Sequence, residues 1–215
     1  MKYLLTDIPW GDLKAVGFDL DGTLYDEFEF IRQAYEKIAP VLVADPGKTI
    51  PALNFMLARW LEKGSSYPHI FGETLDQFYP NQSSHKAKIE KALGIFRSFE
   101  PALSLSERMR FALEELQGKY VLFLVSNGSP VLQRNKVKAL GLESYFKKCN
   151  IFISGDHSKE FEKPGVTLNS KIECLTPELK PKEVLFIGDR DMDKTYAQRS
   201  GFYFAYIDEL FVKNR

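Results

Sequence analysis

The sequence has few cysteines and few histidines, which limits the kinds of site it can build. Its 215 residues include only two cysteines, Cys149 and Cys174, and they do not have the spacing of a metal-binding motif. So few cysteines exclude a disulfide framework, and a reduced, cytoplasmic compartment is predicted. The three histidines, His69, His85 and His157, share no spacing pattern, which argues against a histidine metal site or a catalytic triad.

The sequence also lacks an excess of charge and a long apolar run. Lys plus Arg and Asp plus Glu both number 29, so no basic footprint for nucleic acid or anionic membrane is present. No apolar stretch approaches the roughly 20 residues that span a bilayer, and the apolar run near the first residue is too short for a signal peptide. We therefore expect no nucleic-acid partner and no membrane association, and the oligomeric state is left open.

Residues 27–97 are expected to form a separate helical module. Apolar residues recur there at helical spacing, which predicts helices over residues 27–44, around 53–61, near 73–79 and near 84–97. Pro40 is expected to kink the first helix, Gly64 is a plausible stop for the second, and residues 64–72 are typical of a loop. No segment of this region has the pattern of a strand.

The rest of the chain alternates between strand and helix patterns. Short apolar runs predict strands over residues 15–18, 120–125, 150–154, 184–187 and 203–207. Helices are expected between them: one opened by a capping box of Ser104 and Glu107 and closed by Gly118, and others over 129–141, 164–175 and 193–200. Uniformly apolar strands separated by helices predict an α/β fold with a parallel sheet covered on both faces.

The stretch that organises the chain is residues 18–24, which read FDLDGTL and follow the first predicted strand. In an extended segment Asp19 and Asp21 point the same way, so both carboxylates can face one cleft. Two such charges close together need a cation or a shared proton. The competing interpretation is a hairpin, because Asp-Gly is a strong turn signal.

Polar residues follow the other predicted strands, at the edge where parallel sheets bind ligands. The second strand leads into residues 126–128, SNG, and the fourth into residues 188–193, GDRDMD. Lys163 precedes Pro164, where a helix N-terminus suited to anions is expected. Several carboxylates suit Mg²⁺, and a lysine with a hydroxyl suits a phosphate group.

These motifs, in this order, resemble those of the haloacid dehalogenase (HAD) superfamily of hydrolases over most of residues 15–207. Residues 19–23, DLDGT, are similar to its first motif, Ser126 to its second, Lys163 to its third, and Gly188, Asp189 and Asp193 to its fourth. The resemblance implies a Rossmann-like core, residues 1–24 and 99–215, and a helical C1 cap, residues 25–98. Relatives with this cap often have one more residue between the two acids of the fourth motif, so Asp191 is a possible substitute for Asp193.

The resemblance further implies a phosphatase that hydrolyses a small phosphate monoester. Asp19 would form an aspartyl-phosphate, and Asp21 would serve as general acid and then base. Mg²⁺ would be held by Asp19, the backbone carbonyl of Asp21 and Asp189, and Asp193 would orient the metal's water ligands. The phosphoryl oxygens would be bound by Ser126, Asn127 and Lys163.

Other readings of these residues remain open. A dehalogenase of the same superfamily would not need Asp21, whereas a phosphomutase would keep every motif. A signalling receiver would be shorter and would have no helical insertion, and a non-catalytic phospho-ligand binding protein should have lost a motif residue. Asp193 also fits a helix cap, and Arg190 with Asp191 is typical of a solvated surface pair. No motif in the cap identifies the substrate.

Overall fold

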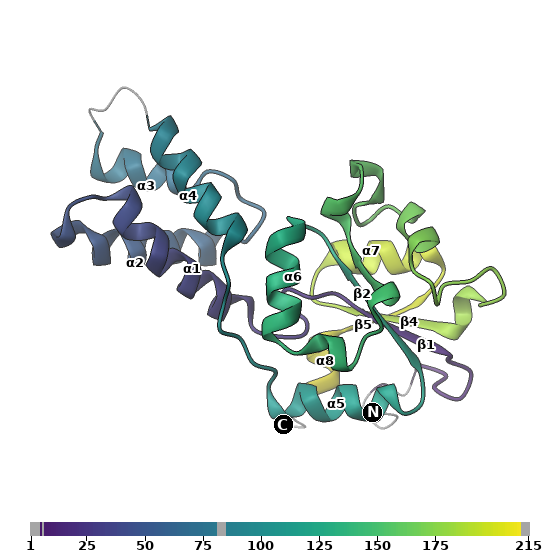
Figure 1. Ribbon diagram of the computed structural model, residues 1–215. Coiled ribbons are helices and arrows are strands. Elements are labelled where there is room, and N and C mark those ends of the chain that lie inside the picture. The colour runs from purple at the N-terminus through teal and green to yellow at the C-terminus, as the bar shows by residue number, and fades with distance from the viewer. Residues whose placement is uncertain (1–4, 6, 81–84, 212–215) are drawn as a thin grey trace. The chain divides into compact units, whose positions relative to one another are not determined.

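The computed structural model describes residue 5, residues 7–80 and residues 85–211. By its packing the chain divides into two compact units. One unit combines the chain up to Asp26 with the chain from Leu103 onward, and the other is Glu27–Ala102. Figure 1 shows the first unit as a sheet with surrounding helices and the second as helices alone.

The first unit is built on a parallel sheet, which confirms the predicted α/β fold. Its strands are β1 (Ala15–Phe18), β2 (Val121–Ser126), β3 (Ile151–Ile153), β4 (Val184–Gly188) and β5 (Tyr203–Tyr206), in the order β3-β2-β1-β4-β5. All four strand pairs are parallel. Phe18, the last residue of β1, lies opposite Leu124 and Ile187. The strand that carries the acid pair is therefore the central one.

Four α-helices accompany the sheet in the described residues. They are α5 (Glu107–Gln117), α6 (Pro130–Ala139), α7 (Asp191–Ser200) and α8 (Ile207–Phe211). Helix α7 packs against β4 and β5 (Figure 1). The predicted capping box at Ser104 is wrong: Ser106 is the N-cap of α5, and its hydroxyl accepts a hydrogen bond from the Met109 backbone N–H at 3.1 Å. Gly118 closes this helix as expected.

The helix predicted from Pro164 to about Leu175 is not formed. Only a 3₁₀ helix, η5 (Thr167–Lys171), occurs there. Gly165, Val166 and Thr167 are all weak helix formers. Leu168 and Ile172 of this segment are nevertheless buried against the sheet in one apolar cluster with Phe186 and Tyr196 of β4 and α7. As a consequence, no α-helix N-terminus stands next to Lys163.

The second unit contains α1 (Glu27–Leu42), α2 (Pro46–Lys63), α3 (Ile70–Phe78) and α4 (Lys86–Ser98). These helices lie between β1 and β2 in the chain, as predicted for an inserted module. Helix α1 continues through Pro40, and Gly64 caps the C-terminus of α2. The predicted loop is shorter than expected, because α3 already begins at Ile70.

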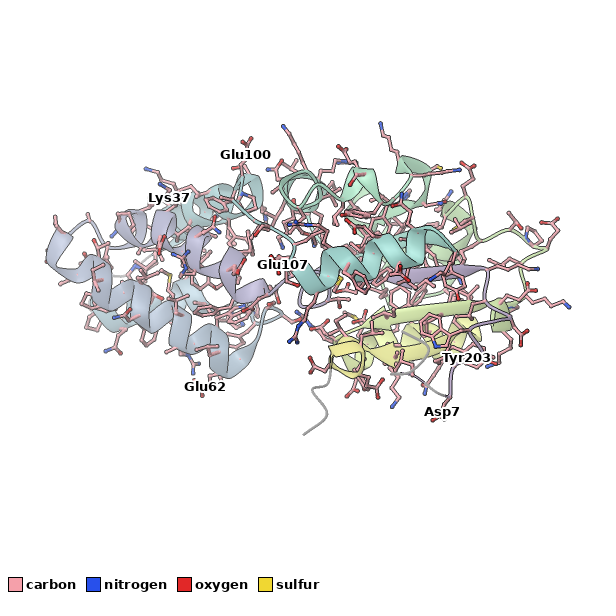
Figure 2. All side chains as sticks on the ribbon, turned by 90° about the horizontal axis from the view of Figure 1, so that it is seen from below. Asp7, Lys37, Glu62, Glu100, Glu107 and Tyr203 are labelled. Carbon is pink, nitrogen blue, oxygen red and sulfur yellow. The ribbon has the colours of Figure 1, made fainter. Side chains whose placement is uncertain are left out.

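Aromatic side chains form much of the core of the helical unit. Phe30, Tyr35 and Phe71 are buried, and each has its ring within 6.4 Å of the Phe96 ring, centroid to centroid. Phe28 and Trp60 are half-buried and pack on each other at 5.9 Å. Charged residues such as Lys37, Glu62 and Glu100 lie on the outside of this unit (Figure 2). Among the described helices, none combines the length and the apolar character needed to cross a bilayer.

Candidate active site

Asp19 lies directly after the central strand and is paired with a buried lysine. Its backbone N–H donates to the carbonyl of Ile187 at 2.9 Å, which continues the β1–β4 ladder by one residue. The Lys163 ammonium group donates to the Asp19 carboxylate and, at 2.5 Å, to Oδ1 of Asp193. Lys163 is 3% exposed. The structure thus brings together three predicted residues that are separated by up to 174 positions in the chain.

Three carboxylates form one cluster here, and two of them, Asp19 and Asp193, accept from this lysine. Asp19, Asp189 and Asp193 each offer a carboxylate oxygen, and these oxygens all lie within 4.8 Å of one another. The Thr23 hydroxyl lies between two of them, 3.5 Å from Oδ2 of Asp19 and 3.4 Å from Oδ1 of Asp189. One buried ammonium group leaves this set with surplus negative charge and oxygen donors only. The donor set therefore fits a hard divalent cation such as Mg²⁺.

Two glycines allow the loops of this cluster to approach closely. Gly22 has a φ of 80°, and a Cβ at that position would lie 2.4 Å from Oδ2 of Asp189. A Cβ on Gly188 would lie 2.4 Å from the Cβ of Asp193. The positive φ of Gly22 thus favours glycine, and at Gly188 the Cβ of Asp193 leaves no room for a side chain.

Burial and charge shift the pKa values of the cluster. Burial raises the pKa of Asp19 to about 7; Lys163 opposes the shift, and the charges of Asp193 and Asp21 add to it. Burial also raises the pKa of Asp189, which Arg190 partly offsets. Burial would lower the pKa of Lys163, but Asp19 and Asp193 outweigh it and raise that pKa. Lys163 is therefore held as an ammonium ion.

Asp191 lies apart from the cluster, although the sequence left it as a possible substitute for Asp193. The Asp191 side chain is exposed and accepts a hydrogen bond from the Tyr206 hydroxyl at 2.6 Å. Asp193 is buried, and its Oδ2 accepts from the Arg190 backbone N–H at 3.2 Å, so it also caps α7. Nε of Arg190 donates to Oδ2 of Asp189 at 3.4 Å.

The loop after β2 carries the second predicted motif and is tied to Lys163. Asn127 forms a pair of hydrogen bonds with the Lys163 backbone: its Nδ2 donates to the carbonyl at 3.1 Å, and its Oδ1 accepts from the N–H at 3.0 Å. The Asn127 amide is thus occupied in fixing the lysine segment. Ser126 is 1% exposed, and its Oγ accepts from Nε2 of Gln133 at 2.8 Å.

Asp21 has partners that the sequence did not predict. Its Oδ1 accepts from the Tyr25 hydroxyl and, at 2.6 Å, from the ammonium group of Lys136. Its Oδ2 accepts from Nε2 of Gln133 at 2.7 Å. Burial alone would raise the pKa of Asp21, but Lys136, Tyr25 and Gln133 hold it below its usual value. The three-residue spacing of Gln133 and Lys136 places both on one face of a predicted helix. Nothing in the sequence indicates that this face contacts Asp21.

These features define an α/β protein with an acidic, cation-compatible site at the carboxyl end of its central strands. A family model described as haloacid dehalogenase-like hydrolase matches residues 13–201. The chain therefore belongs to this family of hydrolases. Its helical unit, inserted between β1 and β2, occupies the position of the C1 cap.

Solved structures with the same fold include proteins of more than one activity. A HAD hydrolase of Bacillus subtilis, solved with bound magnesium, has 21% identity and a TM-score of 0.62 over 91% of this chain and 87% of its own. A protein of Haemophilus somnus, named as a predicted phosphoglycolate phosphatase, has 20% identity and a TM-score of 0.62 over 91% and 84%. The L-2-haloacid dehalogenase of Xanthobacter autotrophicus has 23% identity and a TM-score of 0.55 over 90% and 77%. No curated protein matches the sequence.

Proposed function

We propose that this hydrolase is a Mg²⁺-dependent phosphatase of small phosphate monoesters. The observation that carries the proposal is the cluster of Asp19, Asp189 and Asp193, in which the buried Lys163 ammonium group donates to Asp19 and Asp193. A carboxylate nucleophile and a phosphate ester are both anionic, so their approach requires concentrated positive charge. The cluster can supply that charge through its lysine and a bound cation.

Asp19, Asp189 and the backbone carbonyl of Asp21 would hold Mg²⁺, with Asp193 orienting its water ligands. A bound Mg²⁺ supplies charge that offsets the repulsion between the nucleophile and the phosphate. The magnesium-bound structure of the Bacillus subtilis relative supports this choice of metal. In this chain Asp193 already has both oxygens engaged, by Lys163 and by the Arg190 backbone, which favours an orienting role over direct coordination.

The proposed reaction is a double displacement at phosphorus. An Asp19 oxygen attacks the phosphorus atom, the bond to the leaving oxygen breaks, and that oxygen takes a proton from Asp21. Because its neighbours lower the pKa of Asp21 in the free protein, this step requires that Asp21 gain its proton in the complex with the anionic substrate. Asp21 then takes a proton from water, whose oxygen attacks the phosphorus of the aspartyl-phosphate and releases inorganic phosphate with Asp19 restored. Ser126, the loop backbone at Asn127 and Lys163 would bind the phosphoryl oxygens throughout.

The helical unit is proposed to serve as the cap that selects the substrate. We place the functional core at residues 1–24 and 99–215 and the cap at residues 25–98. Phosphatases of this organisation bind the leaving group through the cap, so the substrate class is a small phosphorylated molecule. The Haemophilus somnus relative, named as a predicted phosphoglycolate phosphatase, supports that class.

Dehalogenation is the second candidate, because the Xanthobacter autotrophicus relative has that activity by name. Its chemistry uses an aspartate nucleophile but involves a halide leaving group, which needs no proton. The chain instead carries a second carboxylate, Asp21, with three donors arranged around it. The presence of this second carboxylate favours a reaction with proton transfer, as in a phosphatase or a phosphomutase.

Magnesium dependence tests the proposed function directly. Purified protein is expected to hydrolyse p-nitrophenyl phosphate with Mg²⁺, and excess chelator should lower the rate at least about a hundredfold because the carboxylates then repel the substrate. Nitrophenolate absorbance measures the rate. The same preparation should release no chloride from 2-chloropropionate. Chloride release without phosphate ester hydrolysis would identify a dehalogenase instead.

Magnesium affinity should depend on pH because a proton and the metal compete for Asp19. With its pKa raised to about 7 in the metal-free protein, Asp19 is protonated below that pH and ionised above it. The Mg²⁺ dissociation constant should therefore rise up to about tenfold per pH unit as the pH falls below 7, and level off above about pH 8. Calorimetric titration across this range measures it. A constant affinity down to about pH 5.5 would contradict the competition.

A further inference from the structure

Both oxygens of the Asp21 carboxylate accept hydrogen bonds from side chains. The donors come from α6, which is far away in the sequence, and from the loop that follows Asp21. Lys136 of α6 donates to Oδ1 at 2.6 Å and Gln133 of α6 donates to Oδ2 at 2.7 Å, while Tyr25 adds a second donor to Oδ1. A carboxylate is planar, so donors at both oxygens fix its rotation as well as its position. The side chain of Asp21 is thereby restricted to one orientation.

The two α6 residues are unusual in how deeply they are buried. Lys136 is 2% exposed and Gln133 is 3% exposed, and they lie three positions apart on one face of the helix. A buried ammonium group is costly unless it is paired, and lysine is among the residues least often buried. Leu132 and Val137 already bury apolar surface from the same helix. Packing of α6 alone therefore does not account for a lysine and a glutamine at these two positions.

Gln133 also connects Asp21 to the predicted phosphate-binding loop. Its Nε2 also lies 2.8 Å from Oγ of Ser126 and 2.9 Å from the carbonyl of Asn127, so its two hydrogens are shared among three acceptors that include Asp21. Its Oε1 is buried and has no hydrogen-bond partner in the part of the chain that the structure describes. Leaving a buried amide oxygen unpaired is unfavourable, so the orientation of this amide is decided by the acceptors around Nε2.

We propose that Gln133 and Lys136 are positioning residues for Asp21, and this inference rests on the proposed phosphatase function. They hold the carboxylate in the orientation from which it gives a proton to the leaving oxygen and then takes one from water. Gln133 in addition fixes the position of this carboxylate relative to Ser126, because its Nε2 contacts both residues. Both residues act through Asp21, so removing them should impair the step that needs Asp21 and spare a reaction that does not.

Two phenyl esters separate this role from a purely structural one. Phenyl phosphate has a poor leaving group that needs a proton, whereas the nitro group of p-nitrophenyl phosphate makes protonation nearly unnecessary. Asp21→Asn should lower kcat/KM for phenyl phosphate roughly a hundredfold or more, and that for p-nitrophenyl phosphate far less. Lys136→Met and Gln133→Leu should show the same selectivity, with about a tenfold loss on phenyl phosphate. The ratio kcat/KM is used because it reports the steps up to departure of the leaving group.

The matched control is Lys138→Met, the same substitution at an exposed position of the same helix, which should change neither rate. In an Asp21→Asn background, Lys136→Met should have no further effect, because residues that act as a unit are not additive. Gln133→Leu leaves no unpaired charge and tests the inference even where Lys136→Met is too unstable to assay.

Equal losses on both esters, or a further loss in the Asp21→Asn background, would overturn the positioning role and leave the phosphatase intact. A wild-type protein that hydrolyses neither ester would instead contradict the proposed function, and the positioning role with it.

Discussion

Replacing Asp19 by Asn is expected to lower kcat for p-nitrophenyl phosphate at least about a thousandfold. The amide has nearly the shape of the carboxylate but no nucleophilic oxygen anion, so the aspartyl-phosphate cannot form. Acid-quenched wild-type protein should carry one phosphoryl group by mass spectrometry during turnover, and the variant none. The protein should remain folded, because the substitution removes a buried charge whose own ionisation is disfavoured at this position.

The control for this prediction is Asp12→Asn, the same substitution at an exposed residue before the amino end of β1. It should retain wild-type activity, since it stands at the opposite end of the strand from Asp19. If Asp19→Asn hydrolyses the ester as fast as Asp12→Asn and the wild type, phosphate ester cleavage does not pass through the Asp19 carboxylate.

Replacing Lys163 by Met is expected to reduce both stability and activity. The substitution leaves Asp19 and Asp193 buried without their ammonium partner, and breaking such a buried pair destabilises proteins by about 3–5 kcal/mol. The rate should fall at least about a hundredfold, because the proposed donation from Lys163 to the phosphoryl group is lost. Urea denaturation at neutral pH and steady-state kinetics measure the two effects.

The loss of stability in Lys163→Met should depend on pH and on Mg²⁺. Without the lysine, the Asp19 pKa rises further above its unfolded value, so folding is favoured at low pH and disfavoured as the pH rises through the folded pKa. The stability difference from wild type should therefore shrink near pH 5.5, roughly where Asp19 is protonated. At neutral pH, added Mg²⁺ should restore part of the stability that the variant has lost. Lys159→Met, at an exposed position four residues earlier, should behave as wild type. A variant as stable as wild type at every pH would contradict the electrostatic account of the cluster.

Much of the fold could be predicted because its signals are local. Uniformly apolar runs marked each of the five strands, and parallel pairing follows from the helices between them. Periodic apolar residues predicted the helical insertion, and Phe30, Tyr35 and Phe71 lie in its core. The prediction failed where it took Pro164 as the start of a helix: Leu168 and Ile172 reach the core from a 3₁₀ segment because the Gly-Val-Thr stretch before them does not support a helix.

The site was partly predictable for a different reason. Residues at the carboxyl ends of neighbouring parallel strands must meet, so Asp19, Ser126 and Asp189 could be placed together from the strand assignment alone. The part of the site that depends on the angle and rotation of a helix could not. A lysine in a helix is expected on the surface. Lys136 is instead buried, and its ammonium group donates to Asp21.

The sequence by itself determined the layout of this hydrolase: a parallel sheet, a helical insertion after the first strand, and acids, a hydroxyl and a lysine at the ends of its strands. Those features follow from patterns among residues that are close in the sequence, so they can be predicted without knowing which distant residues are in contact. Tertiary structure decided which of two acids, Asp191 or Asp193, joins the buried cluster and which groups surround Asp21. These outcomes depend on how α6 and α7 pack against the sheet, and packing is a property of the whole core rather than of any one segment.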